Sequence, residues 1–324
     1  MRITRIATEA AVLLLGLAVQ AAGAEPLRLD ARIALPEVRG RIDHLAIDSA
    51  HRRLFVAALG SDSVEVIDLD AARRVERLRN LREPQGVAYA EQEERLFVAN
   101  ADGGIDVFDA GRRTARIDDL DDADNLRLDG GGRLYVGYAE ALAVIDVKTL
   151  AVTRRIALPA HPESFQLSSS GDRIYVNVPG ARQIAVVSRR EGKVVASWPI
   201  VEASRNFSMA LDEAAQRLFV ATRSPALLLA YDTGSGRMVA SLPTCGDADD
   251  LFLDDKRRQL YVVCGAGKVE VVRELSPGRY ALVASIATSP GARTGLFVPR
   301  LETLFVAAPA AGQRQAEVLV FRIE

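Results

Sequence analysis

The sequence predicts an all-β fold, a seven-bladed β-propeller of four-stranded antiparallel blades. The first observation is a short motif, an aliphatic residue followed by an aromatic residue and Val, that occurs seven times in the 324 residues. Its copies are Leu54-Phe55-Val56, Leu96-Phe97-Val98, Leu134-Tyr135-Val136, Ile174-Tyr175-Val176, Leu218-Phe219-Val220, Leu260-Tyr261-Val262 and Leu304-Phe305-Val306. The second observation is the spacing between copies, which is 42, 38, 40, 44, 42 and 44 residues. Repeats of about 40 residues, each made of short strands, are typical of β-propellers.

The first repeat shows the expected strands of a blade. Short apolar runs at Leu45–Asp48, Leu54–Ala57 and Val64–Asp68 are separated by turn residues. The third strand of several repeats alternates with period two, which indicates packing between neighbouring blades. The Asp that ends many of these strands suits the following turn, because its carboxylate accepts hydrogen bonds from nearby backbone N–H groups. These residues are Asp68, Asp109, Asp146 and Asp232.

The two ends of the chain predict how the ring closes. Residues 27–36 are similar to residues 152–159, which form the outermost strand of a repeat, yet they precede the first full repeat. The last repeat has three strands, at Leu296–Val298, Leu304–Ala307 and Val318–Arg322, and no fourth. We therefore expect residues 27–36 to supply the outer strand of the blade formed by residues 294–324. Such pairing would remove an exposed strand edge, which is prone to aggregation.

The first 24 residues have the pattern of a secretory signal peptide. Arg2 and Arg5 precede an apolar run at 10–19, and Ala22-Gly23-Ala24 supplies a small-residue cleavage site. Residues 25–324 are then a single propeller domain with a periplasmic or secreted location. No other stretch reaches the length of a membrane-spanning helix, so no membrane span is expected in the mature chain.

Charge and cysteine content narrow the function further. With 41 Lys and Arg against 43 Asp and Glu, the chain lacks the basic excess of nucleic-acid-binding domains, so no nucleic-acid partner is expected. Its only two cysteines, Cys245 and Cys264, fall just before an inner strand and at the end of the next strand of one blade. Since adjacent strands are antiparallel and exported chains meet an oxidising compartment, a Cys245–Cys264 disulfide is expected.

Polar residues gather in the connections between blades, which a propeller brings to one end of its central channel. The predicted ligand-binding residues at this channel mouth are Arg41, Asp43, His44, Asp124, Asn125, His161, Glu163, Arg205, Asn206, Asp249 and Arg293. Such a convergence of polar groups is what a small-molecule site requires. The expected ligand is a small polar, in particular anionic, molecule or a side chain of a periplasmic partner. Its affinity should change between about pH 5 and 8, where an unperturbed His titrates.

Two stretches support a family resemblance. FVANADGGIDVFD at 97–109 and IYVNVPGARQIAVVS at 174–188 resemble the YVTN-type repeat of the YncE-like periplasmic seven-bladed propellers. The resemblance covers essentially the whole mature chain and implies the propeller fold. It extends more broadly to lactonase-like propellers, which hold a divalent ion near the channel mouth. Because one fold supports many activities, the resemblance does not decide the chemistry.

Two classes of function remain open on the sequence. The chain has no G-x-S-x-G, H-E-x-x-H, P-loop, G-x-G-x-x-G or C-x-x-C-H motif, which favours a non-catalytic binding or scaffold protein without a cofactor. The alternative is a metal-dependent, lactonase-like hydrolase or lyase with His44 as acid and base. Its divalent metal would need ligands of the types found at His44, Asp124, Glu163, Asn206 and Asp249.

Overall fold

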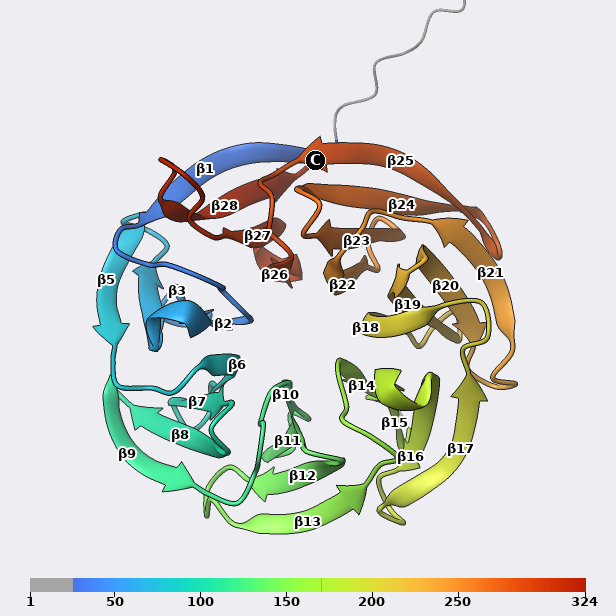
Figure 1. The fold of residues 1–324 in the computed structure, drawn as a ribbon, viewed down its shortest axis with the longest axis horizontal. Helices are drawn as coiled ribbons and strands as arrows, with labels where there is room; N and C mark the ends of the chain where they lie inside the picture. Colours follow the sequence, from blue (N-terminus) through green and yellow to red (C-terminus); the bar gives the residue numbers. More distant parts are fainter. Residues whose placement is uncertain (1–25, 170) are drawn as a thin grey trace, which may run out of the picture.

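The computed structural model describes residues 26–169 and 171–324 and shows seven four-stranded sheets arranged in a ring around a central channel (Figure 1). Strand pairs within each sheet are antiparallel, which confirms the seven-bladed propeller. The predicted signal peptide lies outside the described residues. In the described part of the chain, no helix is long and apolar enough to cross a membrane.

Each of the first six blades runs in chain order from an inner to an outer strand. Blade 1 contains β2 (Leu45–Asp48), β3 (Arg53–Ala58), β4 (Ser63–Asp68) and β5 (Arg73–Leu78). Blade 2 contains β6 (Pro84–Ala90), β7 (Arg95–Asn100), β8 (Gly104–Asp109) and β9 (Arg112–Ile117). Blade 3 contains β10 (Leu126–Leu128), β11 (Arg133–Tyr138), β12 (Ala141–Asp146) and β13 (Val152–Ala157). Blade 4 contains β14 (Phe165–Leu167), β15 (Arg173–Val178), β16 (Gln183–Ser188) and β17 (Lys193–Pro199).

The later blades follow the same plan, and three short 3₁₀ turns accompany the strands. Blade 5 contains β18 (Ser204–Asp212), β19 (Arg217–Ser224), β20 (Ala226–Asp232) and β21 (Met238–Pro243). Blade 6 contains β22 (Ala248–Asp254), β23 (Gln259–Cys264), β24 (Lys268–Ser276) and β25 (Arg279–Ala287). Blade 7 contains β26 (Thr294–Val298), β27 (Thr303–Ala308), β28 (Ala316–Ile323) and β1 (Leu27–Leu35). The 3₁₀ turns are η1 (Leu59–Ser61), η2 (Pro179–Ala181) and η3 (Pro299–Leu301).

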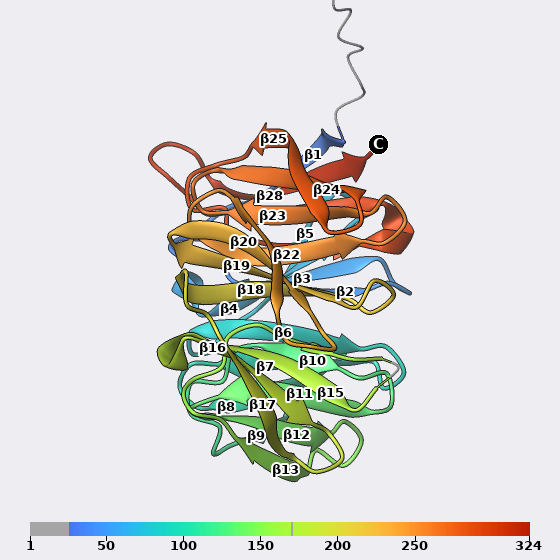
Figure 2. The same ribbon diagram turned by 90° about the vertical axis from the view of Figure 1, so that its right-hand side faces the viewer.

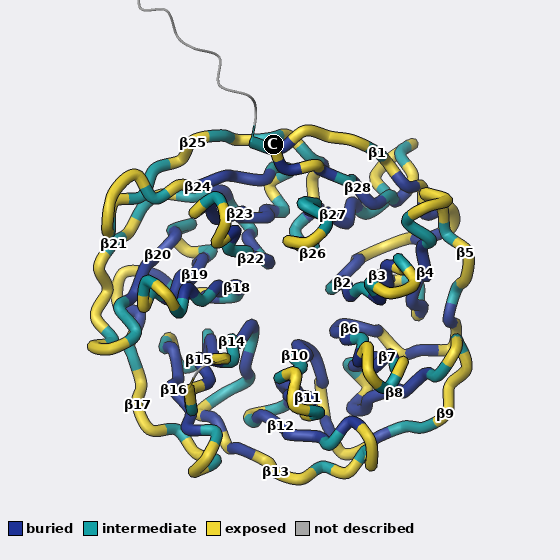
Figure 3. The backbone as a smooth tube through the Cα atoms, turned by 180° about the vertical axis from the view of Figure 1, so that it is seen from behind, coloured by how far each residue is buried: buried dark blue, intermediate teal, exposed yellow. Residues whose placement is uncertain are grey.

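The apolar core lies between blades rather than within one. Among the described residues, the buried apolar side chains form seven clusters, and each combines residues of two adjacent blades. In the cluster between blades 2 and 3, for example, Phe97 and Ile105 pack with Leu134. Middle strands such as β4 are therefore buried on both faces, whereas all but one residue of an outer strand such as β5 are exposed or partly exposed (Figure 3).

The N-terminal strand closes the ring as predicted. β1 pairs antiparallel with β28 from Leu27↔Ile323 to Leu35↔Ala316, with one irregularity near Asp30. It completes the sheet β1-β28-β27-β26 and lies beside the C-terminus, at the edge of the ring (Figures 1 and 2). The backbone N–H of Glu324 donates to the carbonyl of Pro26 at 3.2 Å, so the two ends of the described chain are adjacent.

Candidate functional site

A cavity of about 170 Å³ lies at the channel mouth, where the connections between blades meet. Its lining is almost entirely polar. The lining residues are Arg41, His44, Gln85, Asp122, Asp124, Asn125, His161, Glu163, Ser164, Phe207, Arg223, Asp249 and Arg293. Eight of the eleven residues predicted from the sequence are among them, namely Arg41, His44, Asp124, Asn125, His161, Glu163, Asp249 and Arg293.

The other three predicted residues lie outside the lining. Asp43 is fully buried, with its Oδ2 2.8 Å from the Nη2 of Arg41. Arg205 is exposed. Asn206 is fully buried, and its Nδ2 donates to the Oδ1 of Asn177 at 3.0 Å and to the carbonyl of Gln183 at 3.2 Å. Asn206 therefore ties blade 5 to blade 4.

The sequence prediction missed five lining residues. Gln85, Asp122, Ser164 and Phe207 lie in or beside the connections that the prediction had selected, so a fuller use of those loops would have found them. Arg223 was not predictable in this way, because it is the second-last residue of β19 and reaches the cavity from within blade 5. Its guanidinium lies 3.9 Å from the ring centre of Phe207.

His44 sits among the carboxylates of the preceding Asp43, of Asp124 before β10 and of Asp250 in β22. Its Nε2 is 3.8 Å from the Oδ1 of Asp124, and its Nδ1 is 3.7 Å from the Oδ2 of Asp250. Burial opposes the protonated imidazole, but the charges of Asp250, Asp43 and Asp124 outweigh it and raise the pKa of His44 to about 10. With this pKa, His44 is a cation between pH 5 and 8.

The carboxylates of the mouth titrate in that range instead. Burial and the charge of Asp43 raise the pKa of Asp124 to about 6, although the charge of His44 acts in the opposite direction. Burial and the charges of Asp124 and Asp249 raise the pKa of Glu163 to about 8. Burial also raises the pKa of Asp249, although nearby arginines act in the opposite direction. Near neutral pH, Glu163 therefore carries a proton and can donate a hydrogen bond.

Two arginines hold Asp249 between them. The Nη2 of Arg223 is 2.5 Å from one oxygen of Asp249, and the Nε of Arg293 is 3.0 Å from the other. Both guanidiniums also approach Asp247, at 3.3 Å for Arg223 and 3.2 Å for Arg293. The guanidiniums on this side of the cavity are therefore largely paired with carboxylates, and few of their N–H groups remain for a ligand.

The opposite side of the cavity has acceptors without donors. Asn125 is 2% exposed, and its Oδ1 has no hydrogen-bond partner among the described residues. The Oδ1 of Asp124 also has none within the described chain, since the ring of His44 lies beyond hydrogen-bond distance. Buried acceptors of this kind usually have a partner, so a donor-bearing ligand or water would stabilise them.

No group of three or more His, Cys, Asp or Glu side chains in residues 26–169 and 171–324 is arranged to hold a metal ion. Of the predicted ligand types, Asn206 lies outside the cavity, and both oxygens of Asp249 lie within ion-pair distance of a guanidinium. A protonated His44 has no free nitrogen lone pair to coordinate a cation.

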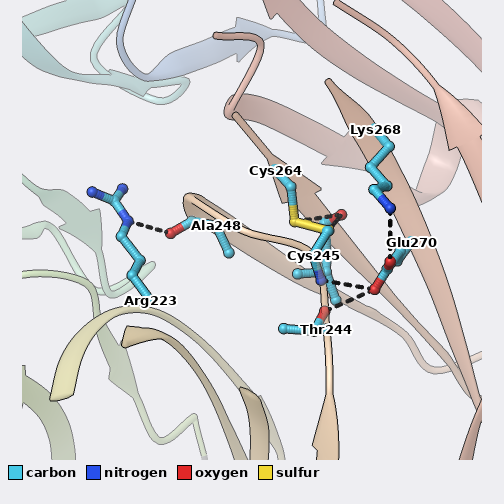
Figure 4. The surroundings of a disulfide bond; sticks show 8 residues. Arg223, Thr244, Cys245, Ala248, Cys264, Lys268 and Glu270 are labelled. Atoms are coloured by element: carbon cyan, nitrogen blue, oxygen red, sulfur yellow. Dashed lines mark hydrogen bonds and ion pairs between the residues drawn. A yellow bond between two sulfur atoms is a disulfide. The ribbon is translucent and has the colours of Figure 1, made fainter. Parts of the chain in front are cut away.

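A disulfide fixes the segment that carries Asp247 and Asp249. Cys245 and Cys264 are bonded, with their Cα atoms 5.9 Å apart, and they flank the start of β22 and the end of β23 (Figure 4). The backbone N–H of Cys245 also donates to the Oε2 of Glu270 at 3.0 Å. The cross-link therefore anchors one side of the mouth to blade 6.

Comparison with solved structures supports the fold alone. A chain of Kuenenia stuttgartiensis hydrazine synthase is similar with a TM-score of 0.77 at 18% identity, over 88% of this chain and 96% of that one. A chain of a mitotic checkpoint complex is similar with a TM-score of 0.76 at 12% identity, over 100% of this chain and 99% of that one. No protein-family model and no curated protein matches the sequence. The chain is a seven-bladed β-propeller.

Proposed function

We propose that this chain is an exported binding protein of the YVTN-type, YncE-like kind, whose mouth cavity receives a small polar molecule or a partner's side chain. The observation that carries the proposal is the cavity itself, in which charged side chains from several blades are buried together. Perturbed pKa values in a concave site are typical of functional sites. Burial of several charged side chains together costs folding stability, so stability alone does not explain the arrangement.

The geometry suggests the chemistry of the ligand. Arg41, whose side chain is 41% exposed, offers a guanidinium edge to a carboxylate or phosphate group. Asn125 and Asp124 offer acceptors to a hydroxyl or ammonium group. We therefore favour a small molecule that bears both an anionic group and a hydrogen-bond donor. The cavity of about 170 Å³ is below the roughly 300–1,000 Å³ of drug-sized sites, which restricts the ligand to a small molecule or one side chain.

Export is supported by two features of the chain. The first 24 residues match the pattern of a signal peptide. The bonded cysteines fit an oxidising compartment, because disulfides are rare in most cytosolic proteins. Expression with the native leader, followed by mass measurement of the secreted chain, tests this part; a mature chain that begins at Glu25 is expected, and a full-length cytoplasmic product would contradict it.

A lactonase-like metal enzyme has less support. Two guanidiniums of the mouth lie against Asp249, and His44 is a cation there rather than a neutral acid–base or metal-binding group. Removal of metal by a chelator is accordingly expected to leave the melting temperature and any ligand binding unchanged.

The binding site is tested with a library of small hydroxy acids and amino acids, using thermal shift and calorimetry. A ligand found this way should lose about tenfold or more in affinity in the variant Arg41→Ala, because the change removes the charged contact of the free guanidinium edge. The matched control is Arg205→Ala, which removes an exposed Arg of the same end of the ring that lies outside the lining. Equal loss in both variants, or in neither, would refute the site.

A further inference from the structure

A second hollow lies between blades 1 and 2, at the end of the ring opposite the mouth. Its volume is about 340 Å³, and it is bordered by the turns that join β2 to β3, β6 to β7 and β8 to β9. Phe55, Tyr89 and Phe108 line it, and the rings of Phe55 and Tyr89 stack with centroids 5.3 Å apart. We refer to this hollow as the blade 1–2 groove.

The rim of the blade 1–2 groove is acidic. Glu76, Glu93 and Glu94 line it, and none of the three forms an ion pair with another described residue. Asp48 and Asp109 also line it, whereas its cationic or titratable basic residues are Arg53 and His51. Aromatic faces surrounded by carboxylates are complementary to a cation.

The same position between blades 3 and 4 contains a guanidinium. Tyr135 holds the register place of Phe55, since each pairs with the central Val of the next strand. The guanidinium of Arg189 lies 5.3 Å from the ring centre of Tyr135 and donates from Nε to its hydroxyl at 3.1 Å. Arg189 also donates from Nη2 to Asp129 at 2.7 Å.

The carboxylate that receives Arg189 has its counterpart in the groove. Asp129 follows β10 and bonds through its backbone N–H to the carbonyl of Arg133, at 3.1 Å. Asp48 ends β2 and pairs with Arg53 in the same register. Asp48 is 2% exposed and lines the groove, where its Oδ2 lies 2.8 Å from the Nδ1 of His51.

In the described chain, no counterpart of Arg189 lies between blades 1 and 2, because Ala110 occupies the corresponding first position of its turn. The turn between β16 and β17 spans residues 189–192 and begins with Arg189, whereas the turn between β8 and β9 is only Ala110-Gly111. Ala110 lines the groove. The groove thus retains the aromatic and acidic parts of the Arg189 site and lacks a counterpart of Arg189, although Arg53 lines it and the guanidinium of Arg113 lies 5.7 Å from the ring centre of Phe108.

Between blades 4 and 5 the chain fills the corresponding space with an aromatic side chain. Trp198 lies between Tyr175 and Tyr231, with ring centroids 5.5 Å and 6.2 Å away. Leu78 holds the register place of Trp198, because both pair with the second residue of the preceding strand. Leu78 is smaller, so the groove stays open.

We propose that the blade 1–2 groove binds an arginine side chain of a partner protein, with its guanidinium over Phe55 and Tyr89 and among Asp48, Glu76 and Glu94. The partner supplies from outside the group that Arg189 supplies between blades 3 and 4. Binding at this groove is independent of the mouth cavity, because the two sites lie at opposite ends of the ring.

The test uses the peptide Gly-Arg-Gly and its neutral counterpart Gly-citrulline-Gly, which keeps the shape of the side chain and removes its charge. Backbone amide shifts in NMR titrations report affinity and location. The arginine peptide should shift amides of the turns around Phe55, Tyr89 and Ala110, and bind about tenfold or more tightly than the citrulline peptide. Equal affinity for the two peptides, or shifts confined elsewhere, would overturn the proposal.

Two variants locate the interaction. Leu78→Trp places in the groove the side chain that closes the gap between blades 4 and 5, and it should abolish the arginine-specific shifts. Glu76→Gln/Glu94→Gln changes exposed residues of the rim and should weaken the arginine peptide about fivefold or more while leaving the citrulline peptide unchanged. If this folded double variant kept full affinity for arginine, the proposal would be wrong, whatever the behaviour of Leu78→Trp.

Discussion

The pKa values of carboxylates are shifted in opposite directions at the two ends of the propeller. At the mouth, burial raises the pKa values of Asp124, Glu163 and Asp249. At the other end, hydrogen bonds from turn N–H groups two or three residues away lower the pKa values of Asp68 and Asp146. At the turn end, an Asp carboxylate accepts hydrogen bonds from neighbouring backbone N–H groups. At the mouth, acidic side chains are buried close to charged residues that are far away in the sequence.

This difference distinguishes carboxylates that stabilise a turn from carboxylates that we assign to a binding site. The carboxylate of Asp146 accepts from the backbone N–H of Thr149 at 2.8 Å and of Lys148 at 3.1 Å, so the turn itself explains its presence. The carboxylates of the mouth meet only because the ring brings different blades together. Charges that fold stability does not require, yet that remain buried, are expected at binding sites.

Loss of ring closure should have the largest effect, because it destroys both ends together. Deletion of residues 25–36 removes β1, including the buried side chains of Leu27, Ile33 and Leu35, and leaves the edge of β28 unpaired. The free energy of unfolding should fall by more than about 5 kcal/mol, measured by urea denaturation.

A circular permutant provides the control for ring closure. A short linker from Glu324 to Pro26, with new ends between β1 and β2, keeps every strand and should retain most of the stability, since the natural ends are adjacent. A truncated chain that melts within about 2 °C of the full-length protein would contradict the role of β1.

Replacement of the buried cation should have the next largest effect, and only at the mouth. His44→Gln leaves Asp43, Asp124 and Asp250 without the charge that offsets them, so the free energy of unfolding should fall by about 3 kcal/mol at pH 7. His51→Gln, at the opposite end, removes a histidine whose side chain is 54% exposed and should cost less than about 1 kcal/mol. Similar losses in urea denaturation would remove the distinction between the ends.

The pH dependence of stability should carry the signature of Glu163. Its pKa rises from 4.5 in the unfolded chain to about 8 in the fold, so the folded state holds the proton more tightly. Its stabilising contribution is complete below about pH 4.5 and is lost as pH rises through about 8. Glu163→Gln should remove this decline, by on the order of 2 kcal/mol, in melting curves between pH 5 and about 9. An unchanged pH profile would show that Glu163 is not buried with the other acids.

The turn carboxylates should show the opposite and smallest response. Because the pKa of Asp146 is lowered in the fold, its contribution is present above its unfolded pKa of 3.8 and is lost as pH falls through the folded value. Asp146→Ala should lower the melting temperature by about 2 °C at pH 7 and reduce the acid sensitivity below about pH 4. If Asp146→Ala altered the pH dependence of stability above pH 5, as Glu163→Gln is expected to do, this local role of Asp146 would be contradicted.

Much of the architecture was predictable because its causes lie within one repeat or at the chain ends. The period of about 40 residues, the alternation along the third strands and the displaced strand at 27–36 are sufficient to predict seven blades and their closure. The role of Asp146 was also predictable, since its partners are two and three residues away. The pairing of Cys245 with Cys264 follows from neighbouring strands of one blade.

The details of the mouth depended on contacts between residues far apart in the chain. Sequence position placed Arg205 and Arg293 in equivalent connections, yet Arg205 is exposed while Arg293 binds Asp249. The protonation of His44 could not be predicted either, because it depends on Asp124 and Asp250, which only the closed ring brings within 4 Å of the imidazole. Local periodicity determines strands and their order, whereas the direction of a loop side chain and its pKa depend on the charges and burial that all seven blades create together.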